Sequence, residues 1–374
     1  MDIDEYAALF AEEPGYLNFA RVGPPGRTVK DEQYGLTGLL GRARFGTIDS
    51  LEEEQDARLR GAVAALTGFS AENVCFQPNT SQGLMHALFG VTGGVALSPG
   101  EFPSNTFATV RASDALGVVT PQWLETDGGR ITPGTLKGQL STKTSAVVVS
   151  LVDFRTGYLT DIEGIRQVIG DRLLILDAIQ GFGLVDAPYE LADVVVSGGQ
   201  KWTRAGWGTG FMALSERALD RITPVISGFT GSEAEGMPID EIPPPVRGAR
   251  AFSISGPDPI AEGRFAAALE EIAQVGVPAI YDRVIEKTDR LIDLADEFGL
   301  PVVSSRAVSE RAGIVVVEPA PDQLTVLEAS MFNHGVSATR RGGTVRLSPH
   351  VSTSEETFDM VRASFTSFAS AITV

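Results

Sequence analysis

The chain has 374 residues, and 30 Lys and Arg against 48 Asp and Glu give a formal net charge of −18. A chain this acidic is poorly suited to bind the phosphate backbone of nucleic acids or an anionic membrane surface. Hydrophobic residues make up 43% and charged residues 21%, a globular composition, and the length suits two or three structural units. Cys75 is the single cysteine, so no disulfide is expected within the chain.

The N-terminal residues MDIDEYAALFAEE lack the basic start and the apolar stretch of a secretory signal. No apolar run in the sequence approaches the ~20 residues that a membrane helix needs. We therefore expect a cytoplasmic protein that binds neither membranes nor nucleic acids.

Strand-like and helix-like segments alternate over the first two hundred residues. Helices are expected over Leu51 to Leu66 (capped by Asp49 or Ser50), Thr80 to Phe89, Thr106 to Leu116 and Ile162 to Ile169 (capped by Asp161), and strands over Asn73 to Gln77, Gly94 to Leu97, Gly117 to Thr120, Ser145 to Leu151, Arg172 to Leu176 and Asp193 to Val196. Because several of these strands are continuously apolar, the pattern predicts an α/β fold with a mostly parallel sheet covered by helices.

The pattern changes at Gly228 to Pro245, a stretch rich in Gly, Pro and acidic residues that we expect to be an irregular connection or a mobile loop. Beyond it, helices are expected over Pro259 to Gln274, Ala279 to Phe298 and Thr353 to Phe368, and strands over Gly313 to Val317, Val336 to Ala338 and Thr344 to Leu347. These elements suggest a large α/β domain at 26–245 and a small α+β domain at 246–374, with 1–25 packing on the small one.

Asp177 and Lys201 each follow a predicted buried strand. Ligands of open α/β sheets bind beyond the carboxyl ends of the strands, so both side chains are candidates for a site. A desolvated lysine in such a place loses its proton and forms a Schiff base with an aldehyde. Taken alone, Asp177 is better explained as a capping residue, and Lys201 as a surface lysine on a turn. A Walker phosphate loop is excluded because Trp202 follows Lys201 where that motif needs Ser or Thr.

A third candidate is the segment Asn79 to Gly83, which follows another predicted strand. Its hydroxyl pair, Thr80 and Ser81, stands where a helix begins, and the free N–H groups of a helix start attract anions. The alternative is a simple helix cap.

The order of these three elements resembles that of the class V aminotransferase family of fold-type-I pyridoxal-phosphate (PLP) enzymes, which includes cysteine desulfurases, kynureninases and isopenicillin N epimerase. The resemblance covers nearly the whole chain, through Tyr16 to Ala20, Ser150 to Gly157, Asp177 to Gln180, Gly199 to Trp202 with Gly206, Gly208 and Gly210, and Val345 to His350. It implies a mostly parallel central sheet in a large domain, a small α+β C-terminal domain, and PLP as the cofactor.

The resemblance also implies roles for individual residues. Lys201 would hold the cofactor as a Schiff base and move the Cα proton, and Asp177 would pair with the pyridinium nitrogen. Phe102 would stack on the ring, and Gln180 would contact its phenolic oxygen. The phosphate would be held by Thr80, Ser81 and Gln82, with Ser197 and Gln200 as further contacts. Arg346 would bind the substrate carboxylate, with Arg340 and Asn18 as further substrate contacts.

The motifs of the sequence indicate the family more closely than they indicate the reaction. Cysteine desulfurases of this family carry a catalytic cysteine in the C-terminal half, whereas Cys75 lies in a predicted buried strand, so a desulfurase is not expected. The remaining reactions start from an external aldimine of an α-amino acid and removal of its Cα proton. We expect an aminotransferase, with a cysteine-independent C–S lyase as the main alternative. Kynureninase-like cleavage, epimerisation and a non-catalytic relative are the other possibilities.

The resemblance finally implies a homodimer that shares its site between subunits. The segment Phe252 to Pro259 resembles the one that a neighbouring subunit contributes to the phosphate. Pro257 stands where relatives have Thr, and proline offers neither a hydroxyl nor an N–H group, so this contact is in doubt.

Overall fold

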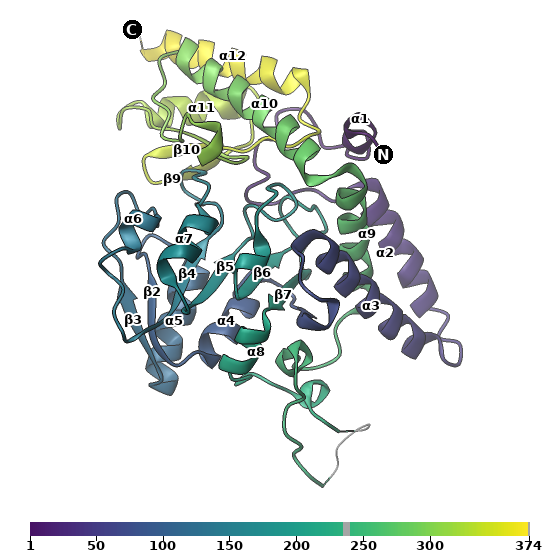
Figure 1. The fold of residues 1–374 in the computed structure, drawn as a ribbon. Helices are drawn as coiled ribbons and strands as arrows, with labels where there is room; N and C mark the ends of the chain where they lie inside the picture. Colours follow the sequence, from purple (N-terminus) through teal and green to yellow (C-terminus); the bar gives the residue numbers. More distant parts are fainter. Residues whose placement is uncertain (235–239, 373–374) are drawn as a thin grey trace.

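The computed structural model describes residues 1–234 and 240–372. Its centre is a seven-stranded sheet with the strand order β1-β7-β6-β5-β4-β2-β3 (Figure 1). The strands are β1 (Val74–Phe76), β2 (Gly93–Leu97), β3 (Val119–Trp123), β4 (Thr144–Ser150), β5 (Leu173–Asp177), β6 (Val194–Gly198) and β7 (Gly210–Leu214). β7 runs antiparallel to both of its neighbours, and the other neighbouring pairs are parallel. The predicted α/β fold with a mostly parallel sheet is confirmed.

Helices cover both faces of this sheet. One face packs against α3 (Thr47–Thr67), α7 (Ile162–Ile169) and α9 (Pro259–Val275), and the other against α4 (Thr80–Gly90) and α5 (Pro103–Leu116). Along β4, Val147 and Val149 belong to the first core, whereas Ala146 and Val148 belong to the second. Successive side chains of a strand point to opposite faces, so a strand covered on both sides has no polar face. This is why the sequence reads as continuous apolar runs.

A second sheet of three strands, in the order β8-β10-β9, forms the centre of the small domain. Its elements are α10 (Val277–Glu297), β8 (Val315–Val317), α11 (Leu324–Asn333), β9 (Thr339–Arg341), β10 (Thr344–Leu347) and α12 (Glu355–Ile372). Tyr16 and Asn18 bridge to Ser337 and Ser348, and Leu17 is buried in the core of this domain. α9 packs on α3 and the large sheet instead. We therefore propose a division near Gly276 in place of residue 246.

Several local predictions need correction. α3 begins at Thr47 after Gly46, not after Asp49 or Ser50. Val336 to Ala338 is not a strand, because only Ser337 makes an isolated bridge there and the hairpin strand starts at Thr339. Elements that the sequence did not suggest are α1 (Ile3–Ala7), α2 (Arg27–Leu40), α6 (Pro133–Leu136), β7, α8 (Glu216–Arg221) and α11. α2 contains Gly35 and Gly38, which weaken any helix prediction.

The predicted irregular stretch Gly228 to Pro245 falls partly outside the described residues, at 235–239. Its described ends hold a short 3-10 turn at Phe229–Gly231 and a bridge between Ser232 and Pro245. Among the helices of the described residues, none has the length and apolar character required to cross a membrane.

Candidate active site

The site lies at one edge of the large sheet, where parallel strands end together. Asp177 is the last residue of β5, and Lys201 follows β6 by three residues. Phe102 follows β2 as the residue that precedes α5, and Thr80 opens α4 after β1. Because β1, β2, β5 and β6 all point the same way, their carboxyl ends bring these four side chains to one crevice.

Lys201 is buried, with 8% of its surface exposed. Its Nζ lies 5.6 Å from the centroid of the Phe102 ring. Burial lowers the pKa of Lys201, the negative charge of Asp177 works in the opposite direction, and the positive charges of Arg346 and Arg341 lower it further. A lysine in these surroundings holds its amine in the nucleophilic, unprotonated form more readily than a lysine in water.

Asp177 is 1% exposed and has one satisfied and one unsatisfied oxygen. Its Oδ1 accepts a hydrogen bond from the Ile179 backbone at 3.1 Å, whereas Oδ2 has no partner among the described residues. Burial raises the pKa of Asp177, while the Ile179 N–H and the charge of Lys201 oppose this shift. A buried oxygen without a donor is costly, so the site calls for a cationic or N–H group at this position.

The start of α4 offers a second unsatisfied group. Thr80 Oγ1 is buried without a partner among the residues described. A Cβ atom on Gly198 would lie 3.2 Å from this hydroxyl and 2.5 Å from Gln200 Oε1, so the ends of the Thr80 and Gln200 side chains both lie close to the Gly198 backbone. Ser197, the neighbouring phosphate candidate on β6, donates its hydroxyl to the Gly198 carbonyl at 3.2 Å.

The capping arrangement changes one predicted contact. The backbone N–H of Gln82 donates to Asn79 Oδ1 at 2.9 Å, so the cap already occupies the group that we expected to hold phosphate. Ser81 shares a hydrogen bond of 2.6 Å with the Ser104 hydroxyl at the start of α5. The hydroxyls of Thr80 and Ser81 are therefore the better candidates at this helix end.

Arg346 on β10 reaches the crevice from the small domain and is 1% exposed. Its Nη1 donates to the Phe154 carbonyl at 2.8 Å, but Nε and Nη2 have no partner in the described part of the chain. Burial lowers the pKa of Arg346, and the neighbouring Arg341 lowers it further. Two parallel N–H groups without acceptors match the geometry of a carboxylate.

Arg340 does not lie where we expected it. Neighbouring residues of a strand point to opposite sides, and on β9 Arg340 pairs with Glu328 at 3.0 Å on the exposed side. Arg341 is instead placed over the Phe154 ring at 4.8 Å, and its charge acts on Lys201 and Arg346. Asn18, the other predicted substrate contact, accepts a hydrogen bond of 2.5 Å from Thr339 on the same strand.

Gln180 is held by two neighbours that the sequence did not indicate. Its Nε2 donates to the Ala20 carbonyl at 2.8 Å, and its Oε1 accepts from Trp202 Nε1 at 3.1 Å. Within the described part of the chain, the second hydrogen on Nε2 remains free for a ligand. Because Trp202 holds Oε1, it fixes the orientation of the amide and so the direction in which this hydrogen can reach a phenolic oxygen.

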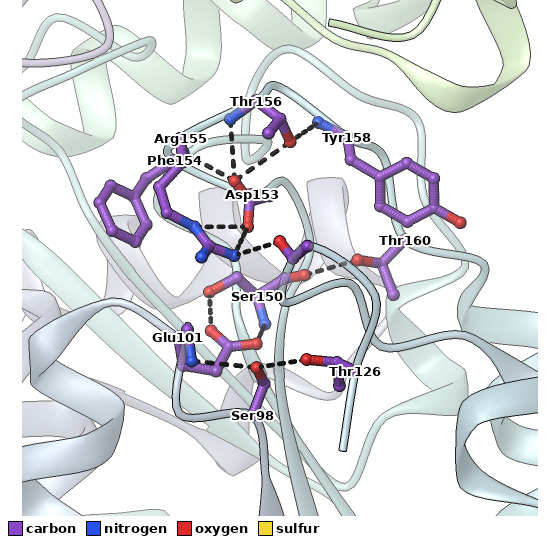
Figure 2. Close-up of polar contacts among 12 residues, drawn as sticks. Ser98, Glu101, Thr126, Ser150, Asp153, Phe154, Arg155, Thr156, Tyr158 and Thr160 are labelled. Carbon is purple, nitrogen blue, oxygen red and sulfur yellow. Dashed lines mark hydrogen bonds and ion pairs between the residues drawn. The ribbon is translucent and has the colours of Figure 1, made fainter. Parts of the chain in front are cut away.

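Glu101 anchors the loop that presents Phe102. Figure 2 shows its carboxylate against the end of β4, where it accepts from the Ser150 backbone at 3.1 Å and from the Ser150 hydroxyl at 2.5 Å. Phe102 then packs edge-on against Phe154, with ring centroids 5.1 Å apart. Burial raises the pKa of Glu101 to about 7. Glu101 directly precedes Phe102 in the sequence, and this position could have identified it as a residue that supports the site.

The unsatisfied buried atoms differ in the chemical group that each would accept. Thr80 Oγ1 suits a phosphate, Asp177 Oδ2 suits a protonated ring nitrogen, and Arg346 suits a carboxylate, with the Lys201 amine among them. The residues present thus fit PLP together with an α-amino acid. The fold and this site define the class of lysine-dependent α/β enzymes that bind a phosphorylated aromatic aldehyde.

The chain belongs to the aminotransferase class-V family, whose model matches residues 52–371. The predicted family, and with it PLP as the cofactor, is confirmed. The chain is 28% identical over 273 residues to a kynureninase of Deinococcus radiodurans, a match that spans 69% of this chain and 64% of that relative.

Solved structures share the fold over almost the whole chain. The apo cysteine desulfurase of Thermococcus onnurineus NA1 superposes with a TM-score of 0.83 at 20% identity and covers 92% of both chains. The cystine C–S lyase C-DES in complex with cysteine persulfide gives 0.82 at 18% identity over 94% of this chain and 97% of that one. A C-DES mutant with glycine covalently linked to the PLP cofactor gives 0.85 at 16% identity, over 97% and 99%.

Proposed function

We propose that this protein is a PLP-dependent enzyme that cleaves the side chain of an α-amino acid without a catalytic thiol. The observation that carries the PLP-dependent part of the proposal is a set of buried polar atoms near Lys201 that have no partner among the described residues: Thr80 Oγ1, Asp177 Oδ2, and Nε and Nη2 of Arg346. A folded chain that leaves these atoms unpaired loses stability, unless a ligand supplies the missing donors and acceptors.

Each residue has a defined task in this proposal. Bound PLP supplies an aldehyde for amino groups and a ring that withdraws electrons from Cα. Lys201, whose pKa is lowered, would hold that aldehyde covalently, and its amine, once displaced by the substrate amino group, would accept the Cα proton. Asp177 holds a proton on the ring nitrogen, and Arg346 fixes the substrate carboxylate through two parallel N–H groups. Phe102 covers one face of the site and excludes water.

The choice of side-chain cleavage rests on relatives and on Cys75. C-DES is a cystine C–S lyase by name, and the matched relative of D. radiodurans is a kynureninase. Cys75 lies in β1 as a buried residue, hydrogen-bonds the Met212 carbonyl, and burial raises its pKa to about 12. A thiol that stays protonated is a poor nucleophile, which argues against a persulfide-forming desulfurase. Transamination, the reaction expected from the sequence, is the second candidate.

We also propose that two copies of the chain form a dimer around a cavity of about 1010 Å³ beside the start of α4. Gln82 on α4, Arg250, and the segment that includes Gly256 and Pro257 line this cavity, whereas Lys201 does not. Among the phosphate candidates, Gln82 lines this cavity, so a neighbouring chain seated there would contact the start of α4. Sedimentation that gives a stable monomer at micromolar concentration contradicts the dimer.

The reaction is tested by product analysis of the PLP-loaded protein with a panel that includes cystine, cysteine, kynurenine and alanine. Cleavage predicts ammonia with pyruvate and a sulfur product, or alanine with an aromatic acid, without accumulation of pyridoxamine phosphate. Stoichiometric pyridoxamine phosphate without cleavage products identifies transamination and overturns the lyase proposal. Absence of any PLP absorption band overturns both.

A further inference from the structure

The N-terminal segment 9–26 lies directly against the loop that carries Lys201, where the two domains meet (Figure 1). The Gly23 N–H donates to the Gln200 carbonyl at 2.8 Å, and the Ala20 carbonyl accepts from Gln180 at 2.8 Å. A Cβ atom on Gly23 would collide with the carbonyl oxygen of Lys201. The segment therefore forms part of the wall that positions the lysine.

Arg204, three residues after Lys201, ties this segment to the loop. It is 1% exposed, and its Nε donates to the Pro24 carbonyl at 2.6 Å while Nη2 pairs with Glu12 at 2.6 Å. The guanidinium lies 3.8 Å from the centroid of the Phe10 ring. Its backbone has a φ of +56°, a conformation that non-glycine residues avoid unless their surroundings impose it.

The same guanidinium reaches the small domain. Its Nη1 donates to Ser352 Oγ at 3.0 Å and to His350 Nδ1 at 3.1 Å. Burial and the charge of Arg204 hold the pKa of His350 well below its usual value, so the imidazole is neutral and Nδ1 accepts this bond. Burial alone would raise the pKa of Glu12, but Arg204 outweighs it and the pKa is lowered, so the pair is ionised.

We infer that Arg204 and Glu12 are positioning residues that hold the N-terminal segment and the small domain against the Lys201 loop, so that the lysine keeps its place in the cofactor site. The inference rests on the proposed function for its link to PLP. Neither residue contacts the unsatisfied atoms of the site. Their effect passes through the backbone contacts of Gly23 and Pro24 with the loop.

The small domain offers a matched control. Arg290 on α10 makes contacts of the same kind as Arg204, since it pairs with both oxygens of Glu355 at 2.6 Å and lies 3.9 Å from the Phe358 ring centroid. It is more exposed than Arg204, with 37% of its side chain exposed against 1%. These contacts stay within the small domain and do not reach the Lys201 loop. Arg290→Ala therefore removes an arginine without disturbing the contacts of Arg204 with Glu12 and Pro24, which we call the clamp.

The test compares Arg204→Ala, Arg204→Lys, Glu12→Gln and Arg290→Ala in the full chain. Hydrogen exchange without added PLP reports on the segment 9–26, and Trp fluorescence titrated with PLP gives the dissociation constant. We expect faster exchange in the segment and at least a tenfold weaker PLP affinity for Arg204→Ala and Glu12→Gln, partial rescue by Arg204→Lys, and neither change for Arg290→Ala. The wavelength and pH midpoint of the cofactor band should shift in Arg204→Ala and Glu12→Gln, and should stay unchanged in Arg290→Ala.

If hydrogen exchange in the segment 9–26 becomes faster but PLP affinity and the cofactor spectrum are unchanged, the inference is overturned, since the clamp is then merely structural. Unchanged exchange also overturns it. If Arg204→Ala does not fold, Glu12→Gln keeps the size of the side chain and decides the question. If the unmodified chain binds no PLP, the proposed function fails, but the exchange data still show whether the clamp holds the segment.

Discussion

Two arginines of this protein are equally buried and differ in what surrounds them. Arg204 uses all three of its nitrogens, on Pro24, Glu12, Ser352 and His350. In Arg346, Nη1 donates to the Phe154 carbonyl, whereas Nε and Nη2 have no acceptor among the described residues. A buried, satisfied arginine is part of the scaffold, whereas a buried arginine with unpaired nitrogens marks a place where a ligand completes the structure.

The largest expected effect comes from the lysine between these two environments. Lys201→Ala removes the amine that binds the aldehyde, so we expect loss of the visible cofactor band and a fall in kcat/KM on the order of 10³-fold or more. Absorption spectra with added PLP and steady-state assays measure both quantities. A band that persists in this variant would show that another group binds the cofactor.

Arg204→Ala and Arg346→Ala should differ most in stability. Removal of Arg204 leaves Glu12 as a buried, unpaired charge, which costs roughly 3–5 kcal/mol of unfolding free energy. Removal of Arg346 takes away a charge that is itself unpaired without ligand, so the apoprotein should lose much less. Urea unfolding of the two variants without PLP checks this, and equal losses would contradict the distinction.

For substrate binding we expect the opposite order, with a larger loss in Arg346→Ala than in Arg204→Ala. Arg346→Ala leaves the substrate carboxylate without its partner, and a lost charged pair of this kind costs about 2–5 kcal/mol. We expect this mainly as a raised KM, with PLP affinity nearly unchanged. Arg340→Ala is the matched control, because Arg340 pairs with Glu328 on the exposed side and should leave KM unaffected.

The smallest expected effect is a pH dependence of stability. The pKa of Glu12 is lowered in the folded chain from a usual value of 4.5, so its contribution is complete above that pH and is lost as the pH falls through the folded pKa. Glu12→Gln should therefore destabilise the chain at neutral pH but flatten the loss of stability below about pH 4.5. Thermal unfolding of both proteins from pH 3 to 7 measures the difference.

The sheet could be predicted from the sequence because its signals are local, and the same signals make Asp177 and Lys201 candidates for the site. Apolar runs predict strands covered on both faces, and Asp177 and Lys201 directly follow such runs. The clamp was not predictable in the same way, since Glu12 and Arg204 are 192 residues apart and neither lies in a recognisable motif.

Arg341 was not suggested as a site residue for a different reason. The side to which a strand residue points depends on the register of its hairpin, and a shift by one residue exchanges the faces. The register of β9 with β10 pairs Arg340 with Val345, which sets the orientation only once the hairpin has formed. Sequence alone gives two adjacent arginines without this information.

The central claim is that PLP binds at Lys201, among the unsatisfied atoms of the crevice. The most direct measurement is borohydride reduction of the PLP-saturated protein, followed by peptide mass spectrometry. The chain has a second buried lysine, Lys287, whose Nζ donates to the Thr353 carbonyl at 2.6 Å and which serves as an internal control. The account predicts a phosphopyridoxyl group on Lys201 and none on Lys287. A label on another lysine, or no label at saturation, would contradict it.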